Sequence, residues 1–517
     1  MRQIKISKLN RFLLLLTIVK FILPFLLQSS VYEPHRDELL YLAEAHHMAW
    51  GFMEAPPLLS VFAWLTNLFG GGMFWIKFWP SLFGAFTFIL TGKIILSLGG
   101  KWFALLITFF AFVMGAFLRT HYLFQPGFLE IFFCTAIAFS LIRFSETGKN
   151  NWLYAMGSSI GLGMMSKYSV AFFVVGILFG LLVTSQRKIL KNKHLYFALL
   201  LALLIFLPNL IWQSLHHFPV VYHMKELQQT QLQYTNPISF LTDQLMMNLA
   251  CIFVWMAGLI YLLFFRNAKQ YRFIGWAYIF VIILLLLGRG KSYYSLGAYP
   301  VLFAFGAYHL EKFSSGKRMF LRYIFVAFIL FIGYYSVPIL LPIFKPEKLA
   351  AFYQKHHLEK TGALKWEDLQ NHPLPQDFAD MLGWEEMAKK TAKAYNSLDD
   401  NEKKSTIIFC DNYGQAGALN YYAHKYNLPQ TYSDNASFLY WLPDSEHFEN
   451  VVLITGDEQE MQHPFIKEFQ SAVLKDSITN FYAREKGSLI IVLRGPNADF
   501  RKSFKEKINK DKAKASW

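Results

Sequence analysis

The sequence predicts a polytopic α-helical membrane protein that ends in a soluble α/β domain. Hydrophobic residues make up 54% of the chain and charged residues only 16%, a balance that soluble globular proteins seldom have. Apolar stretches long enough to cross roughly 30 Å of hydrocarbon recur between residues 10 and 342. After residue 343 the apolar runs shorten to the length of β-strands. The chain therefore has a membrane part and a soluble part.

We expect about eleven membrane-spanning helices, which is the number of separate apolar stretches. The first stretch should remain as an anchor, because no small-x-small cleavage site follows Leu27. The predicted spans are residues 10–30, 74–98, 102–118, 126–143, 152–166, 168–185, 195–213, 246–266, 272–288, 294–310 and 319–342.

Basic residues indicate the orientation, because cytosolic loops are enriched in Lys and Arg. If the number of spans is right, every basic cluster lies on the same side as the N-terminus, which is then the cytosol. The clusters are Arg2, Lys5, Lys8 and Arg11; Arg143 and Lys149; Arg187, Lys188, Lys191 and Lys193; Arg266, Lys269 and Arg272; and Lys312, Lys317 and Arg318. The net charge of +15 therefore requires no nucleic-acid partner.

The sequence divides into a transmembrane domain, residues 1–343, and a soluble extracytoplasmic α/β domain, residues 344–500. In the soluble domain we expect strands at 406–410, 451–454 and 489–493 and a helix at 384–398. Cys410 is the only cysteine of that domain, so it holds no internal disulfide. The basic tail, residues 501–517, is highly charged and is expected to be frayed.

The long first outer loop, residues 31–73, carries an acidic pair, Asp37 and Glu38. The apolar spacing after Asp37 predicts a helix along the membrane surface, with both carboxylates in its first turn. Neighbours on a helix point about 100° apart, so only one of the two faces a given site. The alternative interpretation is that both carboxylates merely complement the positive end of the helix.

Other polar side chains recur at the outer ends of the predicted spans. Each one alone is explained by snorkelling or by the interfacial aromatic belt. Together they favour an outer cavity that holds an anion, because ionisable groups near spans are costly unless they face a polar space. The residues are Arg119, His121, Gln125, Glu130, Lys167, Tyr168, Asn209, Trp212, Gln213, His216, His217, Arg289, Lys291, Tyr293 and Tyr294.

One carboxylate and several cations suit the transfer of a sugar from a lipid phosphate. The acceptor hydroxyl needs a base and the departing phosphate needs positive charge, whereas no general acid is needed. On this hypothesis Asp37 is the base, Lys291 and Lys167 bind the phosphate, and Arg36 or Arg289 adds to them.

This chemistry requires no cofactor. A divalent metal site built from His35, His46, His47 and Glu44 is the other interpretation of the first outer loop. Adjacent histidines on a surface helix are more often solvated than bound to metal.

These motifs resemble the GT-C superfamily of membrane glycosyltransferases that use polyprenyl-phosphate sugars. Within it, the chain resembles the branch of protein O-mannosyltransferases and the lipid A aminoarabinose transferase, over most of its length. The resemblance rests on residues 35–41, on Glu54-Ala55-Pro56-Pro57-Leu58, on Gly161-Leu162-Gly163 and Ser166-Lys167-Tyr168, on Gly290-Lys291-Ser292-Tyr293-Tyr294 with Tyr299-Pro300, and on Asn412-Tyr413-Gly414-Gln415-Ala416-Gly417-Ala418.

The resemblance implies a hexosyl- or pentosyltransferase that inverts the anomeric centre. In the superfamily the first-loop acidic residue is the catalytic base, here Asp37, with Glu38 as its supporter; Glu130 matches a second-loop acidic residue that is more commonly Asp. The implied substrate-binding residues are Arg36, Glu130, Lys167, Tyr168, Arg289, Lys291 and Tyr294. The implied partners are a polyprenyl-phosphate sugar donor, the bilayer of a bacterial inner membrane, and a glycan, lipid or protein acceptor.

Two rival classes stay open. A transporter or flippase of lipid-linked sugars would also need an outer cationic cavity, but it predicts interrupted helices in both halves, for which the sequence gives little sign. A non-catalytic envelope assembly protein would leave Asp37 dispensable.

Reporter fusions test the predicted topology. Reporters fused after residues 190, 269 and 316 should be cytosolic, and those after residues 230 and 400 external, because the basic loops stay in the cytosol. The measurement is alkaline phosphatase activity against fluorescent-protein signal for each fusion. An external signal at residue 316 would show that the number of spans is wrong.

Overall fold

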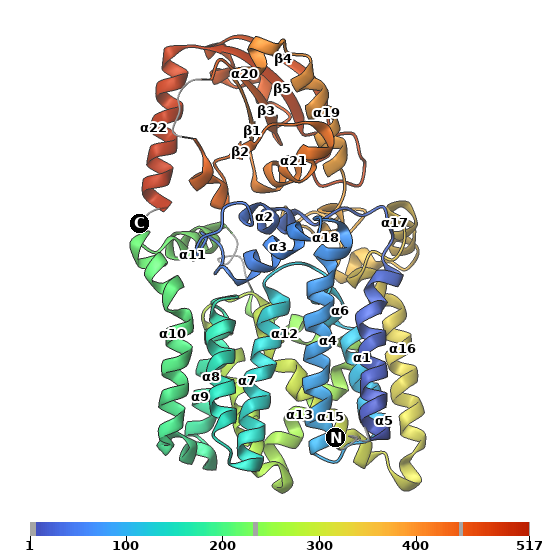
Figure 1. The fold of residues 1–517 in the computed structure, drawn as a ribbon. Helices are drawn as coiled ribbons and strands as arrows, with labels where there is room; N and C mark the ends of the chain where they lie inside the picture. The colour runs from blue at the N-terminus through green and yellow to red at the C-terminus, as the bar shows by residue number, and fades with distance from the viewer. Residues whose placement is uncertain (1–6, 231–235, 444–447, 516–517) are drawn as a thin grey trace.

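A computed structural model describes residues 7–230, 236–443 and 448–515. A bundle of long helices carries a sheet-containing domain at one end, and the N-terminus lies at the opposite end of the bundle (Figure 1). This arrangement agrees with a chain whose N-terminus and soluble domain lie on different sides of a membrane.

Each predicted span overlaps a helix. Among the described residues, 6 helices are long and apolar enough to cross a membrane, or up to 8 if each of two bent pairs is one span, so the number of eleven stays a prediction. The helices are α1 (Lys8–Leu27), α4 (Met73–Ser97), α5 (Trp102–Val113), α7 (Gly127–Thr147), α8 (Asn151–Met164), α9 (Val170–Leu182), α10 (Lys193–Leu215), α13 (Ile252–Phe264), α14 (Arg272–Leu287), α15 (Tyr299–Phe313) and α16 (Phe320–Leu340).

Loops at the end of the bundle away from the sheet are joined by hydrogen bonds. Glu146, after the basic residue Arg143, accepts from the hydroxyls of Ser97 and Tyr271, both at 3.0 Å. Asn192, at the start of α10, donates to Asn150, at the start of α8, also at 3.0 Å. The basic loops that these residues flank therefore gather at one end, as the predicted alternation requires.

Short helices lie between the bundle and the sheet. In Figure 1, α2 (Arg36–Glu44) and α3 (Leu58–Leu68) lie across the end of the bundle, as expected for part of the first outer loop. Further short elements of this part of the chain are α6 (Ala116–Thr120) and α12 (Pro237–Met246), which lie among the bundle helices in Figure 1, together with α11 (Pro219–Thr230) and the 3-10 helix Ser292–Ala298.

The C-terminal part contains a five-stranded sheet in the order β2-β1-β3-β5-β4, in which β1, β2 and β3 are parallel and β5 is antiparallel to both neighbours. The three predicted strands are present, whereas β2 and β4 were not predicted. The elements are α17 (Pro346–Lys355), α18 (Gln376–Ala379), α19 (Trp384–Asn396), α20 (Asp400–Lys404), β1 (Thr406–Cys410), α21 (Tyr413–Tyr426), β2 (Thr431–Ser433), β3 (Asn450–Thr455), β4 (Phe469–Ser477), β5 (Leu489–Pro496) and α22 (Ala498–Ala515).

The expectation of a frayed tail was wrong, because the basic stretch forms α22. Phe500, Phe504 and Ile508 recur every four residues, so they line one face of the helix. Phe500 and Phe504 pack on the face of the sheet that includes Val451 and Leu453. This apolar face holds an otherwise charged helix against the domain.

The sheet domain and the first outer loop share a hydrophobic core. Leu39 and Leu40 of α2 are buried with Trp384 of α19 and Leu419 of α21. Because α2 belongs to this core, the position of Asp37 depends on how the C-terminal domain docks.

Two glycines set the crossing of α13 and α15. A Cβ at Gly306 would overlap the carbonyl of Val254, and one at Gly258 would overlap the carbonyl of Leu302. The two backbones therefore meet directly, as they do where small residues bring membrane helices together.

Gly306→Ala should destabilise the protein by about 1–3 kcal/mol or more, because the new methyl group forces α13 and α15 apart. The thermal midpoint in detergent should fall accordingly. Gly127→Ala is the matched control, since a Cβ at Gly127 meets nothing within 4 Å. Equal midpoints for the two variants would contradict this account of the packing.

Candidate active site

A cavity of ≈ 1360 Å³ lies between the bundle and the C-terminal domain. Its walls come from segments far apart in the sequence. Its polar lining includes His35, Arg36, Asp37, Glu54, Arg119, Gln125, Lys167, Tyr168, Asp243, Lys291, Tyr293, Tyr294, Asp377, Asp380, Tyr413 and Arg484.

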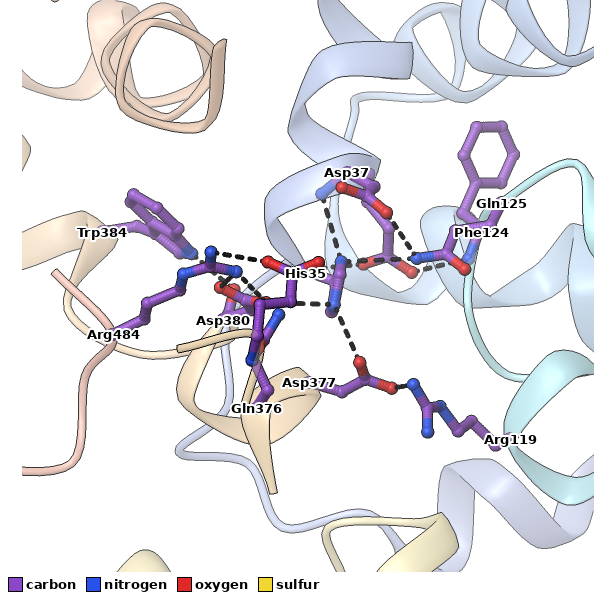
Figure 2. Close-up of polar contacts among 12 residues, drawn as sticks. His35, Asp37, Arg119, Phe124, Gln125, Gln376, Asp377, Asp380, Trp384 and Arg484 are labelled. Carbon is purple, nitrogen blue, oxygen red and sulfur yellow. Dashed lines mark hydrogen bonds and ion pairs between the residues drawn. The ribbon is translucent and has the colours of Figure 1, made fainter. Parts of the chain in front are cut away.

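Asp37 stands at the N-terminal turn of α2 and borders this cavity. The amide of Gln125 donates to its Oδ2 at 3.0 Å, and the hydroxyl of Tyr413 donates to its Oδ1 at 2.8 Å. The backbone N–H of Asp37 donates to Nδ1 of His35 at 3.1 Å. Figure 2 shows the side-chain amide of Gln125 beside both the Asp37 carboxylate and the ring of His35. The carboxylate is thus fixed on both oxygens while it faces the cavity.

Glu38, the next residue, points into the protein and is fully buried. Its carboxylate pairs with the ammonium of Lys77 at 2.5 Å and accepts backbone N–H bonds from Phe124 at 2.6 Å and His35 at 2.8 Å. The acidic pair therefore divides as the helix geometry predicted, with one carboxylate toward the cavity and the other toward the interior.

Lysine side chains enter the cavity from the loop after α8 and the loop after α14. Lys167 pairs with Glu130 at 2.7 Å, and its ammonium lies 4.7 Å from the ring centroid of Tyr294. The ammonium of Lys291 lies 6.0 Å from the ring centroid of Tyr293. Burial lowers the pKa of Lys291 below its usual value, against the opposing effects of nearby carboxylates. These cations, partly removed from water, suit an anionic ligand.

The C-terminal domain contributes a wall of paired charges. Asp380 is buried and pairs with Arg484 at 3.2 Å, and burial raises the pKa of its carboxyl. Asp377 pairs with Arg119 in the last turn of α6. Nε2 of His35 lies 3.8 Å from Asp377 and 3.9 Å from Asp380, so it bridges the two acids (Figure 2).

The structure brings most of the residues proposed from the sequence to one cavity. Arg36, Asp37, Lys167, Tyr168, Lys291 and Tyr294 line it. Glu38, Glu130 and Arg289 are not part of its lining. Glu130 instead pairs with Lys167 and accepts a hydrogen bond from the hydroxyl of Ser169 at 2.6 Å. It therefore positions a lysine that lines the cavity.

Sequence reasoning missed Lys77, Tyr413 and the wall formed by Asp377, Asp380 and Arg484. Lys77 could have been identified from the sequence, because a lysine inside an apolar span needs a partner of opposite charge. The wall residues could not, since acids and arginines in a soluble domain are ordinary surface residues. Tyr413 belongs to the motif Asn412–Ala418, which the sequence indicated without a role for the tyrosine.

The residues considered for a divalent metal do not come together, so that interpretation of them was wrong. Nε2 of His46 contacts Asn67, the ring of His47 stacks on Trp441, and Glu44 accepts from Ser60. Across the described ranges, no group of three or more His, Cys, Asp or Glu side chains forms a candidate metal site.

The bundle, the docked sheet domain and the cavity between them define a multi-pass membrane protein with the GT-C fold. The profile of the family "dolichyl-phosphate-mannose-protein mannosyltransferase" matches residues 54–212. The resemblance read from the sequence is therefore confirmed. No curated protein sequence matches the chain significantly.

Among solved structures, the chain is similar to ArnT from Cupriavidus metallidurans. The form bound to undecaprenyl phosphate has 11% sequence identity and a TM-score of 0.63, over 93% of this chain and 97% of that chain. The apo form has 12% identity and a TM-score of 0.60, over 94% and 98%. At these identities the likeness concerns the fold.

Lys291→Ala should weaken binding of a polyprenyl-phosphate donor by on the order of 2 to 5 kcal/mol, because a desolvated charge contact is lost. Lys291→Arg should restore only part of it. Because burial lowers the pKa of Lys291, the charge present at neutral pH is lost at less alkaline pH than for an ordinary lysine. Donor affinity should therefore fall as pH rises through that pKa, and Lys291→Arg should remove this fall.

The measurement is lipid-phosphate binding to purified protein across pH. Lys348→Ala is the control, since this lysine is exposed near the start of the C-terminal domain and does not line the cavity. Unchanged affinity in both Lys291→Ala and Lys167→Ala would place the phosphate site elsewhere.

Proposed function

We propose that this protein is a glycosyltransferase that moves a sugar from a polyprenyl-phosphate donor to an acceptor hydroxyl, with inversion. The observation that carries this proposal is the carboxylate of Asp37, fixed on both oxygens and facing a cavity that also contains Lys167 and Lys291. A base and clustered cations in one cavity are the groups that this transfer needs.

In the proposed reaction the acceptor oxygen attacks the anomeric carbon from the side opposite the phosphate. Asp37 takes the hydroxyl proton as the new carbon–oxygen bond forms. The old bond to the phosphate oxygen breaks, and the phosphate leaves with the bonding electrons. Lys167 and Lys291 compensate the charge that develops on it. The single displacement inverts the anomeric centre.

A lipid donor is supported by the apolar side of the same cavity. Met246, the last residue of α12, and Met247 line the cavity together with Ile332, Ile339 and Leu340 of α16, which suits the prenyl chain of a lipid. The similar ArnT structure bound to undecaprenyl phosphate agrees with such a donor.

We propose different roles for the two parts of the chain. Residues 1–343 embed the base and the phosphate site in the membrane, and residues 344–500 cover the cavity from outside without a catalytic carboxylate of their own. We place the protein in a bacterial inner membrane with the cavity at its outer face, where a glycan, lipid or protein acceptor is available. The basic loops at the opposite end of the bundle support this orientation.

Asp37→Asn should fold and bind donor yet lose transfer by about 10²- to 10⁴-fold, because the amide keeps the shape and cannot accept the proton. Glu38→Gln should act differently: it leaves Lys77 buried without its partner, which costs stability on the order of 3–5 kcal/mol. The measurements are single-turnover transfer and thermal unfolding of each purified variant.

The contrast between these two variants identifies the base. Parental transfer by Asp37→Asn would disprove the assignment. A well-folded Glu38→Gln that cannot transfer, beside an active Asp37→Asn, would move the role to Glu38. Indifference of the envelope glycans to both changes would favour a transporter or an assembly protein.

A further inference from the structure

The motif Asn412–Ala418 forms the start of α21 and brings Tyr413 from the C-terminal domain to the base. The hydroxyl of Tyr413 donates to Oδ1 of Asp37 at 2.8 Å, and Gln125 from the bundle side donates to Oδ2 at 3.0 Å. The carboxylate is thus held between the two parts of the protein. The proposed mechanism gave no role to the tyrosine.

The state of Tyr413 suits a hydrogen-bond donor. Burial, and next the charge of Asp37, raise the pKa of Tyr413 well above its usual value, so the phenol is neutral and keeps its proton. The guanidinium of Arg36 lies 4.6 Å from the ring centroid and fixes the ring from one face. The hydroxyl of Tyr413 is therefore aimed at the carboxylate while the ring stays in place.

The glycines of the motif allow this approach. A Cβ at Gly414 would lie 2.5 Å from Cγ of Arg36, and a Cβ at Gly417 would lie 3.0 Å from the backbone carbonyl of Leu39. Both glycines therefore face α2 and let α21 lie directly against it. Asn412 caps the helix, accepting from the backbone N–H groups of Gly414 and the following residue.

We propose that Tyr413 is a positioning residue for Asp37, and that the motif Asn412–Ala418 serves to deliver its hydroxyl. This inference rests on the proposed role of Asp37 as the base. The bond fixes the carboxylate in one rotamer. Oδ1 keeps a second lone pair and Oδ2 is shared only with Gln125, so either oxygen can still accept the proton of the acceptor hydroxyl. The C-terminal domain then completes the active site as well as covering it.

Tyr413→Phe removes only the hydroxyl and keeps the ring beside Arg36. We expect kcat to fall about 10- to 100-fold with little change in donor KM, since the effect acts through the base.

Tyr422→Phe is the matched control. Tyr422 lies on the same helix and donates to Oε1 of Glu33 at 3.0 Å, so it makes the same kind of bond between α21 and the first outer loop. It does not line the cavity. Its loss should leave kcat unchanged, whereas a fall in kcat equal to that of Tyr413→Phe would assign the effect to domain docking and overturn the inference.

Two further variants make the test independent of folding. Gly417→Ala keeps the Tyr413 hydroxyl and pushes α21 a little away from α2, so it should lower kcat in the same direction but less. In the double variant of Asp37→Asn with Tyr413→Phe, the second change should cause no additional loss, because both act through one carboxylate.

The outcomes separate this inference from the proposed function. If Asp37→Asn is inactive while Tyr413→Phe has the parental kcat, the role of Tyr413 is disproved and the base stands. If Asp37→Asn is active, the base itself is wrong. An additional loss in the double variant would also overturn the inference, since Tyr413 would then act independently of Asp37.

Discussion

Glu38 and Lys77 form a fully buried ion pair at 2.5 Å, and the geometry of the site depends on it. Two charges withdrawn from water are tolerated only when they satisfy each other and their remaining hydrogen bonds. Glu38 does so by also accepting from the backbones of His35 and Phe124. One carboxylate thereby ties the first outer loop to α4 and to the segment before α7.

The position of the catalytic candidates follows from that constraint. With Glu38 fixed inward, helix geometry turns Asp37 toward the cavity. The residue after Phe124 is Gln125, so the backbone bond that satisfies Glu38 also sets the side chain that binds Asp37. The buried carboxylate of Glu38 and the candidate catalytic carboxylate of Asp37 are therefore adjacent in sequence, because the first turn of α2 positions both of them.

The sequence allowed local features to be predicted and left contacts between distant segments unknown. The different directions of the two carboxylates in the acidic pair and the strand that ends at Cys410 could be predicted, because they depend on the helical angle and on short apolar runs. Helix α22 was missed because its apolar stripe, which includes Phe504, is diluted by lysines. The bond from Tyr413 to Asp37 joins residues 376 positions apart, and no local pattern encodes such a pairing.

Cations that line the cavity already form ion pairs with carboxylates in the structure. These ion pairs affect how the site would bind and release a phosphate. Lys167 pairs with Glu130, and Arg119 with Asp377. A phosphate that binds there must displace these carboxylates from the cations. The net free energy of phosphate binding is therefore reduced by the free energy needed to break the existing ion pairs. In the proposed reaction, these carboxylates pair with the cations again once the lipid phosphate departs. In this proposal, competition from the carboxylates keeps the departed phosphate from being bound too tightly, and attraction that is equal in the ground state and the transition state does not raise kcat.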